Sequence, residues 1–251
     1  MHNAALAALG LTDWHYQKLP IPPAAFAETV RALGELGFAG VNVTIPHKEA
    51  ALALADTATE AARGIGAANT LSFTDAGIEA DNTDAAGLLD AIAPVCDVTG
   101  VRALVLGAGG AGRAAVYALL NAGASDVMVW NRTHARAERL CAELGGRAIR
   151  AAEPADLVVQ CTSVGLRQAD EPFKRLPLDA DTFGAGICVV DLVYRADDTT
   201  FLAAARSRGA DVIDGLEVLV GQGARALERW TGRSAPRDVM RRAVIDPSPT
   251  V

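Results

Sequence analysis

A glycine-rich turn between an apolar run and a helical pattern restricts the fold of this chain more than any other feature. The segment VRALVLGAGGAGRAAVYALL places Gly107, Gly109 and Gly112 in G-x-G-x-x-G spacing. In this context Gly107 allows a tight turn, Gly109 lets a pyrophosphate approach the backbone, and Gly112 lets the helix pack close to the strand. The N–H groups and the dipole at the helix start favour phosphates. The context disfavours the alternative, a glycine-rich turn that binds nothing. The predicted dinucleotide contacts are Gly107, Ala108, Gly109, Gly110 and Ala111.

The end of the next expected strand indicates which dinucleotide binds. A strand at this position in an NAD-binding unit usually ends in Asp or Glu, which binds the ribose 2′-hydroxyl. Here the end reads VWNRTHAR, which has no carboxylate and carries Asn131, Arg132, Thr133 and Arg136 instead. An arginine can make a charge-assisted, bidentate contact with a phosphate. The sequence therefore favours NADP over NAD, and the alternative is that both arginines are solvated residues at a helix start.

Apolar runs that read as strands alternate with helical patterns along the whole chain, and several of these strands are continuously apolar. This pattern is typical of parallel sheets covered on both faces, the α/β class. A TDAG turn between two short strands predicts a hairpin at 69–83. The strands are expected at 16–21, 40–45, 69–73, 77–83, 101–107, 126–132, 155–163, 187–194 and 211–214. The helices are expected at 1–11, 23–37, 47–56, 84–92, 109–123, 133–145, 200–210, 216–232 and 236–245.

Composition excludes several classes of protein. The 251 residues are 51% hydrophobic, which is enough to bury a substantial core. A net charge of −7, without a basic run and with 5% aromatic residues, argues against nucleic-acid binding. No segment reads as a membrane span or a signal peptide. Four scattered cysteines show no metal-site spacing and are expected to be small buried hydrophobic residues, so we predict no metal and a cytoplasmic location.

Seven segments in a fixed order make the chain resemble the shikimate dehydrogenase family. They are GVNVTIPHKEA, IGAANT, DNTDAAG, LGAGGAGRAA, NRTHARA, VVDLVYR and GLEVLVGQGARALERWTG. The resemblance implies two α/β domains around a cleft. Residues 1–84, completed by 216–251, would bind the substrate, and residues 85–215 would form an NADP-binding Rossmann domain with a doubly wound parallel sheet. The implied reaction is the reversible NADP-dependent reduction of 3-dehydroshikimate to shikimate, a step toward aromatic amino acids.

The resemblance also assigns roles to single residues. It makes Lys48 the catalytic acid/base and Asp84 its partner, which suits the chemistry because an ammonium can stabilise and protonate the oxygen of a carbonyl that receives hydride. The residues implied to hydrogen-bond the substrate hydroxyls are Thr44, Asn69, Tyr194 and Gln222. Those implied to lie beside the cofactor are Glu60, Leu192 and Gly215. Taken singly, each has an ordinary alternative: Lys48 as a solvated helix-start lysine, Asn69 and Asp84 as turn or cap residues, Gln222 as a polar residue of an amphipathic helix.

The chain departs from the family pattern at its start. The family pattern opens with a strand and a Ser-x-Ser-x-x-x-His-Asn loop, and this chain opens at His2 and Asn3, the end of that motif. We expect an upstream segment to supply the strand and the two carboxylate-binding serines, since losing a central strand would expose backbone groups. Without them, recognition of the substrate carboxylate should be weak. Two other functions stay open: a quinate/shikimate dehydrogenase that uses NAD, and a non-catalytic NADP-binding regulatory relative. The expected partner is the small-molecule substrate, shikimate or 3-dehydroshikimate, and we expect the protein to be a monomer or a homodimer.

Overall fold

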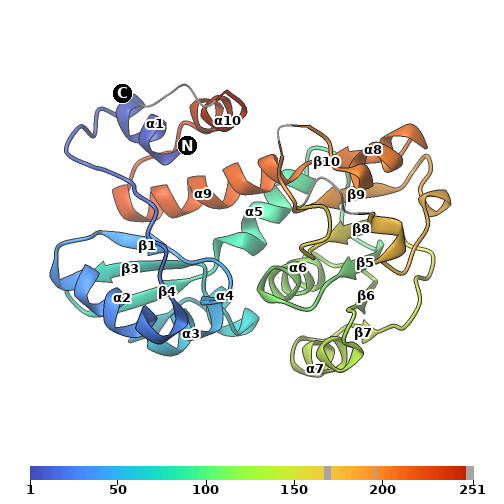
Figure 1. Cartoon of the computed structure of the whole chain (residues 1–251), viewed down its shortest axis with the longest axis horizontal. Coiled ribbons are helices and arrows are strands. Elements are labelled where there is room, and N and C mark those ends of the chain that lie inside the picture. Colours follow the sequence, from blue (N-terminus) through green and yellow to red (C-terminus); the bar gives the residue numbers. More distant parts are fainter. Residues whose placement is uncertain (167–170, 196, 247–251) are drawn as a thin grey trace. The chain divides into compact units, whose positions relative to one another are not determined.

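The chain forms two compact units in a computed structural model that describes residues 1–166, 171–195 and 197–246. The first unit comprises residues 1–84 and 220–251, and the second comprises residues 85–219. Both borders fall inside helices, namely α5 (Thr83–Ile92) and α9 (Gly215–Thr231), which are labelled in Figure 1.

The first unit contains a mixed four-stranded sheet. Its strands are β1 (Gly40–Asn42), β2 (Thr57–Ala58), β3 (Thr70–Thr74) and β4 (Gly77–Asp81), in the order β1-β3-β4-β2. The expected hairpin is confirmed, because β3 and β4 pair antiparallel. β1 also pairs antiparallel with β3, and only β2 and β4 are parallel. The expectation of parallel sheets throughout the chain is therefore wrong for this unit.

Helices supply the rest of the apolar core of the first unit. They are α1 (His2–Ala8), α2 (Phe26–Glu35), α3 (Lys48–Leu54), α4 (Glu60–Ile65), α10 (Arg237–Ile245) and the second part of α9. A short 3₁₀ turn, Pro23–Ala25, precedes α2. One cluster of buried side chains joins Phe26 and Val30 of α2 to Leu71 of β3. A second joins Leu6 of α1, Leu227 of α9 and Met240 of α10.

Two strand predictions in the first unit are wrong. Residues 16–21 form no strand: Leu19 is exposed, and the backbone N–H and C=O of Tyr16 bond to the side chain of Asn3 instead of a neighbouring strand. The strand expected at 40–45 ends at Asn42, and Ile45 is 77% exposed. Apolar residues such as Leu19 and Ile45 therefore lie in loops here and not in a buried strand.

The second unit confirms the predicted Rossmann-type sheet. Its six strands are β5 (Arg102–Leu106), β6 (Asp126–Trp130), β7 (Arg147–Ala148), β8 (Leu157–Gln160), β9 (Cys188–Asp191) and β10 (Asp211–Ile213). They are all parallel and follow the order β10-β9-β8-β5-β6-β7, so the strand order reverses at β5. Ligands of such sheets bind outside the carboxyl ends of the strands at this reversal.

Both faces of the parallel sheet are buried. Ala103 and Val105 of β5 belong to one apolar cluster, while Leu104 and Leu106 belong to another. Successive side chains of a strand point to opposite faces, so the two clusters lie on opposite faces of the sheet. The covering helices and turns are α5, α6 (Gly110–Asn121), α7 (His134–Leu144), α8 (Thr200–Ser207), and the 3₁₀ turns Pro172–Lys174 and Ala180–Thr182. This double covering explains why these strands are continuously apolar.

Cysteine burial differs from the prediction. All four cysteines are free, but only Cys188 is buried, and Cys96, Cys141 and Cys161 are half-buried at the margin of the core. Within the described residues no helix has both the length and the apolar character needed to cross a membrane.

Candidate active site

Lys48 and Asp84 form an ion pair in the first unit. Lys48 Nζ lies 2.5 Å from Asp84 Oδ2, and the two side chains are only 15% and 19% exposed. Lys48 is therefore not a solvated helix-start lysine, and its ammonium has a defined direction. The structure brings together the two residues that the resemblance assigned to catalysis.

The sequence around Lys48 explains its position at the start of α3. His47 is the residue before the helix, its ring stacks on Phe26 with centroids 4.5 Å apart, and its Nε2 lies 2.9 Å from Ile21 O. The Lys48 carbonyl accepts a hydrogen bond of 2.9 Å from Ala68 N, next to Asn69. His47 thus fixes the loop on one side, and the Ala68 contact places Lys48 beside the GAANT segment.

Asn69 is the centre of a buried polar network beside this pair. It is 2% exposed, and its Oδ1 accepts from Thr83 N at 2.8 Å and from Thr70 Oγ1 at 3.0 Å. Its Nδ2 donates to Asp84 Oδ1 at 2.8 Å and to Gln222 Oε1 at 3.3 Å. Three predicted site residues, Asn69, Asp84 and Gln222, therefore meet at one amide group.

The other predicted residues of the first unit lie nearer the surface. Thr44 is exposed, and within the described part of the chain its hydroxyl has no hydrogen-bond partner, so it is available to a ligand. Glu60 is exposed in the first turn of α4 and shows no contact with the Lys48–Asp84 pair.

Helix α9 holds Gln222 in place through contacts seven and eight residues further along. Arg229 Nη2 lies 2.7 Å from Glu79 Oε1, and its Nη1 donates to Asp81 Oδ2 at 3.2 Å. Trp230 Nε1 donates to the Leu71 carbonyl at 3.1 Å. These bonds tie the C-terminal part of the helix to β3 and β4, the two strands of the hairpin that follows Asn69.

The glycine loop of the second unit has the geometry that a pyrophosphate needs. Gly107 has φ of +115°, a conformation that favours glycine, and a Cβ at Gly112 would overlap the Gly107 carbonyl oxygen. A Cβ at Gly109 would meet no atom within 4 Å, so the backbone there borders open space. Gly109 precedes α6, and no side chain caps that helix start. The first N–H groups of α6 therefore remain for a ligand, and the predicted contacts from Gly107 to Ala111 share this one turn.

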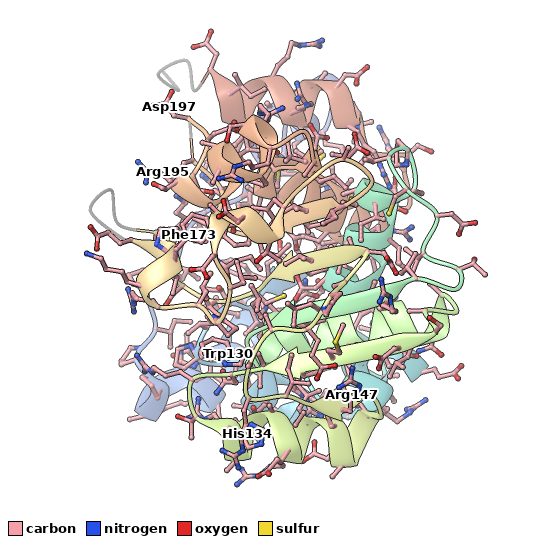
Figure 2. The ribbon with its side chains drawn as sticks, turned by 90° about the vertical axis from the view of Figure 1, so that its right-hand side faces the viewer. Trp130, His134, Arg147, Phe173, Arg195 and Asp197 are labelled. Atoms are coloured by element: carbon pink, nitrogen blue, oxygen red, sulfur yellow. The ribbon has the colours of Figure 1, made fainter. Side chains whose placement is uncertain are left out.

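The NRTHAR segment lies beside the glycine loop. Asn131 Oδ1 accepts from Ala108 N at 3.2 Å, and Asn131 Nδ2 donates to Thr133 O at 2.9 Å. Trp130 and His134, labelled in Figure 2, bracket the turn between the end of β6 and the start of α7. Arg132 and Arg136 are exposed, and neither guanidinium has a partner among the described residues. Two unpaired cations at an uncapped helix start suit a phosphate.

Leu192 and Gly215 are neighbours at the carboxyl ends of β9 and β10. A Cβ on Gly215 would lie 2.9 Å from the Leu192 backbone, so only glycine permits this approach. Tyr194 follows in the same loop and is 53% exposed. The structure thus places two of the predicted residues, Leu192 and Gly215, side by side, with Tyr194 two residues further along the loop.

Sequence reasoning missed a buried carboxylate beneath this loop. Asp191 is 0% exposed and accepts from Thr199 Oγ1 at 2.6 Å, Val193 N at 3.0 Å and Gln160 Nε2 at 3.3 Å. Burial raises the pKa of Asp191 to about 6, although the bonds from Thr199 and Val193 act to lower it. Gln160 also holds the next loop, through Thr162 N at 2.5 Å. An acidic residue that ends the apolar run CVVD was the available signal.

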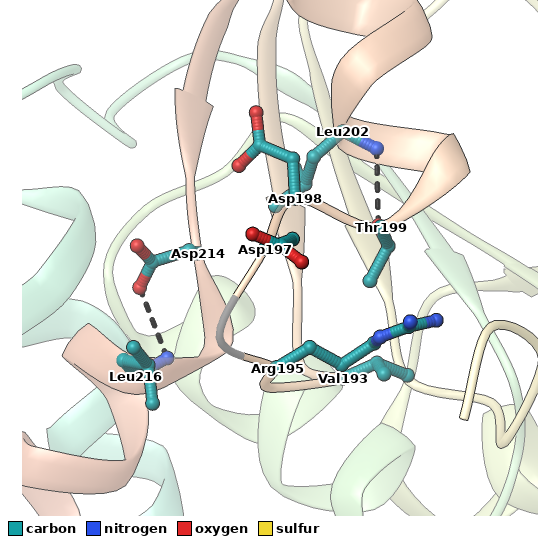
Figure 3. A pocket seen from close by; sticks show the side chains of 8 residues that line it. All are labelled: Val193, Arg195, Asp197, Asp198, Thr199, Leu202, Asp214 and Leu216. Atoms are coloured by element: carbon teal, nitrogen blue, oxygen red, sulfur yellow. Dashed lines mark hydrogen bonds between the residues drawn. The ribbon is translucent and has the colours of Figure 1, made fainter. Parts of the chain in front are cut away.

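Figure 3 shows a small pocket beside the same loop. Two of its three carboxylates already have structural partners: Asp198 pairs with Arg206 at 2.9 Å, and Asp214 accepts from Leu216 N at 3.0 Å. Among the described residues no group of three His, Cys, Asp or Glu side chains could hold a metal ion. The pocket therefore offers no cation site.

Comparison with known proteins matches three parts of the chain to domains of shikimate dehydrogenases. The profile of the shikimate dehydrogenase substrate binding domain matches residues 1–71, the shikimate / quinate 5-dehydrogenase profile matches residues 90–164, and the shikimate 5'-dehydrogenase C-terminal domain matches residues 215–245. A shikimate dehydrogenase (NADP(+)) of Paracoccus denitrificans is 43% identical over 258 residues, which cover 98% of this chain and 90% of that protein. The chain belongs to the shikimate dehydrogenase family.

Two solved structures of this fold differ in activity. The shikimate 5-dehydrogenase of Thermus thermophilus, solved with NADP(H) and shikimate, has a TM-score of 0.87 and 41% identity, with 96% of this chain and 91% of that chain covered. The 5-ketofructose reductase of Gluconobacter sp. strain CHM43 has a TM-score of 0.86 and 28% identity, with coverage of 96% and 90%. The shared fold alone therefore does not determine the substrate. The substrate must be argued from the residues of the site.

Proposed function

We propose that this chain catalyses the reversible NADP-dependent reduction of 3-dehydroshikimate to shikimate. The observation that carries the proposal is the Lys48–Asp84 pair with the Asn69 amide on the same carboxylate. We further propose that the first unit binds the substrate and the second binds NADP. The alternatives are quinate as a substrate, NAD as cofactor, and a regulatory protein without turnover.

NADP, when bound, supplies or accepts the hydride at the reacting carbon. The chain's own contribution is proton transfer at the substrate oxygen. Lys48 Nζ stabilises charge that develops on this oxygen during reduction and then donates a proton to it; in the reverse direction it removes that proton. Asp84 keeps the ammonium oriented, because its Oδ2 lies 2.5 Å from Nζ. The pair is mostly buried, so water competes weakly with this interaction.

Substrate hydroxyls need both donors and acceptors, and the site supplies both. Asn69 and Gln222 carry amides, and Thr44 carries an exposed hydroxyl. Asn69 cannot turn its amide over without losing the bond from Thr83 N, so its donor side is fixed toward Asp84. We propose that these three residues and Tyr194 select a ring that bears vicinal hydroxyls.

Three observations support NADP binding by the second unit. Open space borders Gly109, the start of α6 lacks a side-chain cap, and Arg132 and Arg136 stand unpaired beyond β6 within the described residues. We propose that the arginines and Thr133 hold the 2′-phosphate, that the glycine loop holds the pyrophosphate, and that Leu192, Gly215 and Glu60 contact the remainder.

An absorbance assay at the nicotinamide band tests the proposal. Shikimate and quinate are offered with NADP or NAD for oxidation, and 5-ketofructose with NADPH for reduction. We expect turnover with shikimate and NADP to exceed every other combination, and Lys48→Ala to abolish most of it. Preference for quinate and NAD, or for 5-ketofructose, would contradict the substrate assignment. NADP binding without any turnover would support the regulatory alternative.

A further inference from the structure

A continuous chain of hydrogen bonds ends on the Asp84 carboxylate. Tyr16 Oη donates to Asn42 Oδ1 at 3.1 Å, and Asn42 Nδ2 donates to Thr70 Oγ1 at 3.3 Å. Thr70 Oγ1 in turn donates to Asn69 Oδ1 at 3.0 Å, and Asn69 Nδ2 donates to Asp84 Oδ1 at 2.8 Å. The chain thus joins the N-terminal loop to the carboxylate that orients Lys48.

A backbone group fixes the direction of every bond in this chain. Thr83 N can only donate, and it lies 2.8 Å from the Asn69 side-chain oxygen. Asn69 therefore presents its oxygen to Thr70, so the Thr70 hydroxyl must donate there and accept from Asn42. Asn42 then presents its own oxygen to Tyr16, whose hydroxyl donates. All the donors point toward Asp84, and aligned bonds of this kind polarise one another and favour negative charge at the final acceptor.

Tyr16 is held firmly at the far end. Asn3 Oδ1 accepts from Tyr16 N at 2.7 Å, and Asn3 Nδ2 donates to Tyr16 O at 3.0 Å. The Tyr16 ring stacks on His2 with centroids 4.1 Å apart and planes 9° from parallel. Burial raises the pKa of Tyr16, so its hydroxyl keeps its proton at neutral pH. The first donor of the chain therefore has little freedom to turn away.

We propose that Tyr16 and Asn42 are positioning residues of the reaction, which act through Thr70 and Asn69 to hold the Asp84 carboxylate toward Lys48. This inference rests on the proposed function, and it adds two residues that would not touch substrate. The chain has no branch that bypasses Asn42 between Tyr16 and Thr70. Tyr16 can therefore influence Asp84 by this route only while Asn42 is present.

A double-mutant cycle of Tyr16→Phe and Asn42→Ala tests whether Tyr16 acts on Asp84 through Asn42. Tyr16→Phe removes one hydroxyl and leaves a ring that can still stack on His2. The control is Tyr117→Phe in α6 of the second unit, since the Tyr117 hydroxyl has no partner within the described residues. For each variant the kcat and KM for shikimate oxidation, the NADP dissociation constant and the denaturant midpoint are measured.

Each single change in the cycle should lower kcat about 2- to 10-fold, the equivalent of one hydrogen bond, and leave NADP binding unchanged. The double variant should lose no more than Asn42→Ala alone, because the Tyr16 hydroxyl, the only group that Tyr16→Phe removes, bonds to Asn42 alone among the described residues. Unchanged kcat in both single variants, a double loss equal to the product of the single losses, or an equal loss in Tyr117→Phe would overturn the inference. A wild-type protein that does not oxidise shikimate would overturn the proposed function and this inference with it. An active wild type with unaffected variants would overturn the inference alone.

Discussion

Lys48 and Asp84 lie 36 residues apart in sequence and form a 2.5 Å contact between Nζ and Oδ2. Two elements make this contact possible: α3 begins at Lys48, and Asp84 lies in the first turn of α5. Asn69, at the start of the hairpin between them, bonds the second carboxylate oxygen at 2.8 Å. The carboxylate is thus held from both sides, which orients the ammonium before any substrate arrives.

Replacing Lys48 by Ala should lower turnover of shikimate by about 10²–10⁴-fold, the range for loss of a general acid or base. NADP binding should persist, since the glycine loop belongs to the other unit. Steady-state kinetics and a cofactor titration measure both effects. Lys18→Ala, at an exposed lysine of the same unit, is the control and should leave turnover near wild type. If Lys48→Ala kept a turnover near that of the wild type, Lys48 would not be the acid/base of the reaction.

Replacing Arg132 by Ala should weaken NADP binding by about 1.5–3 kcal/mol, the contribution of a hydrogen bond to a charged group. NAD binding should hardly change, because NAD lacks the 2′-phosphate. Calorimetric titration with both cofactors gives the two dissociation constants. Arg139→Ala, an exposed position later in α7, serves as the matched control. Equal losses for NADP and NAD would show that Arg132 does not read the phosphate.

The second unit was predictable from sequence because its physical causes are local. Strands buried on both faces are apolar along most of their length, and β5, β8 and β9 show this as the runs ALVL, LVV and CVV. The glycine turn has its own spacing signal. By contrast, β2 and β7 have two residues each and exist only because β4 and β6 pair with them. No local pattern marks a strand whose partner defines it.

The first unit was harder to predict because its key contacts join distant segments. Periodicity gives no reason for Lys48 to meet Asp84, and only the family resemblance placed them together. The structural roles of His47, Tyr16 and Asn42 also come from partners 13 to 28 residues away. A polar amide within the β-branched run VNVT was a signal for Asn42, but its partners were not readable from it.

Asp191 should make stability depend on pH. Its folded pKa of about 6 lies above the ordinary value of 3.8, so the folded state holds a proton that the unfolded chain releases. The stability contributed by that proton is complete below pH 3.8 and is lost as pH rises through about 6. Wild type should therefore lose up to about 3 kcal/mol relative to Asp191→Asn over this interval.

Urea unfolding at several pH values from 4 to 7.5 measures the difference between wild type and Asp191→Asn. Asp179→Asn, at an exposed carboxylate of the same unit, should show a difference that hardly varies over this range. A wild type that tracks Asp191→Asn at every pH would mean that Asp191 is not destabilised by its burial.

Replacing Gly109 by alanine should weaken NADP binding and leave the stability of the fold almost unchanged. Its Cβ would meet no protein atom within 4 Å and its φ is −94°, so stability should change by less than about 0.5 kcal/mol. The same Cβ would enter the space that a pyrophosphate needs, so NADP affinity should fall about 10-fold or more. Gly112→Ala is the contrast: its Cβ would overlap the Gly107 carbonyl and should destabilise the unit by about 1–3 kcal/mol. Normal NADP affinity in Gly109→Ala would show that the pyrophosphate does not bind against the backbone of Gly109.

Alanine at Gly40 should disturb the contact between β1 and α9. A Cβ there would overlap the Trp230 indole and the Leu71 carbonyl, which are joined by a 3.1 Å hydrogen bond. We expect a loss of about 1–3 kcal/mol in the free energy of unfolding, since a packed site must shift to admit a methyl group. Gly184→Ala, where a Cβ meets nothing within 4 Å, should stay close to wild type. Because Gln222 lies on α9, the KM for shikimate should rise while the NADP dissociation constant stays constant. Destabilisation without any change in KM would show that Arg229 alone, through Glu79 and Asp81, keeps Gln222 in place.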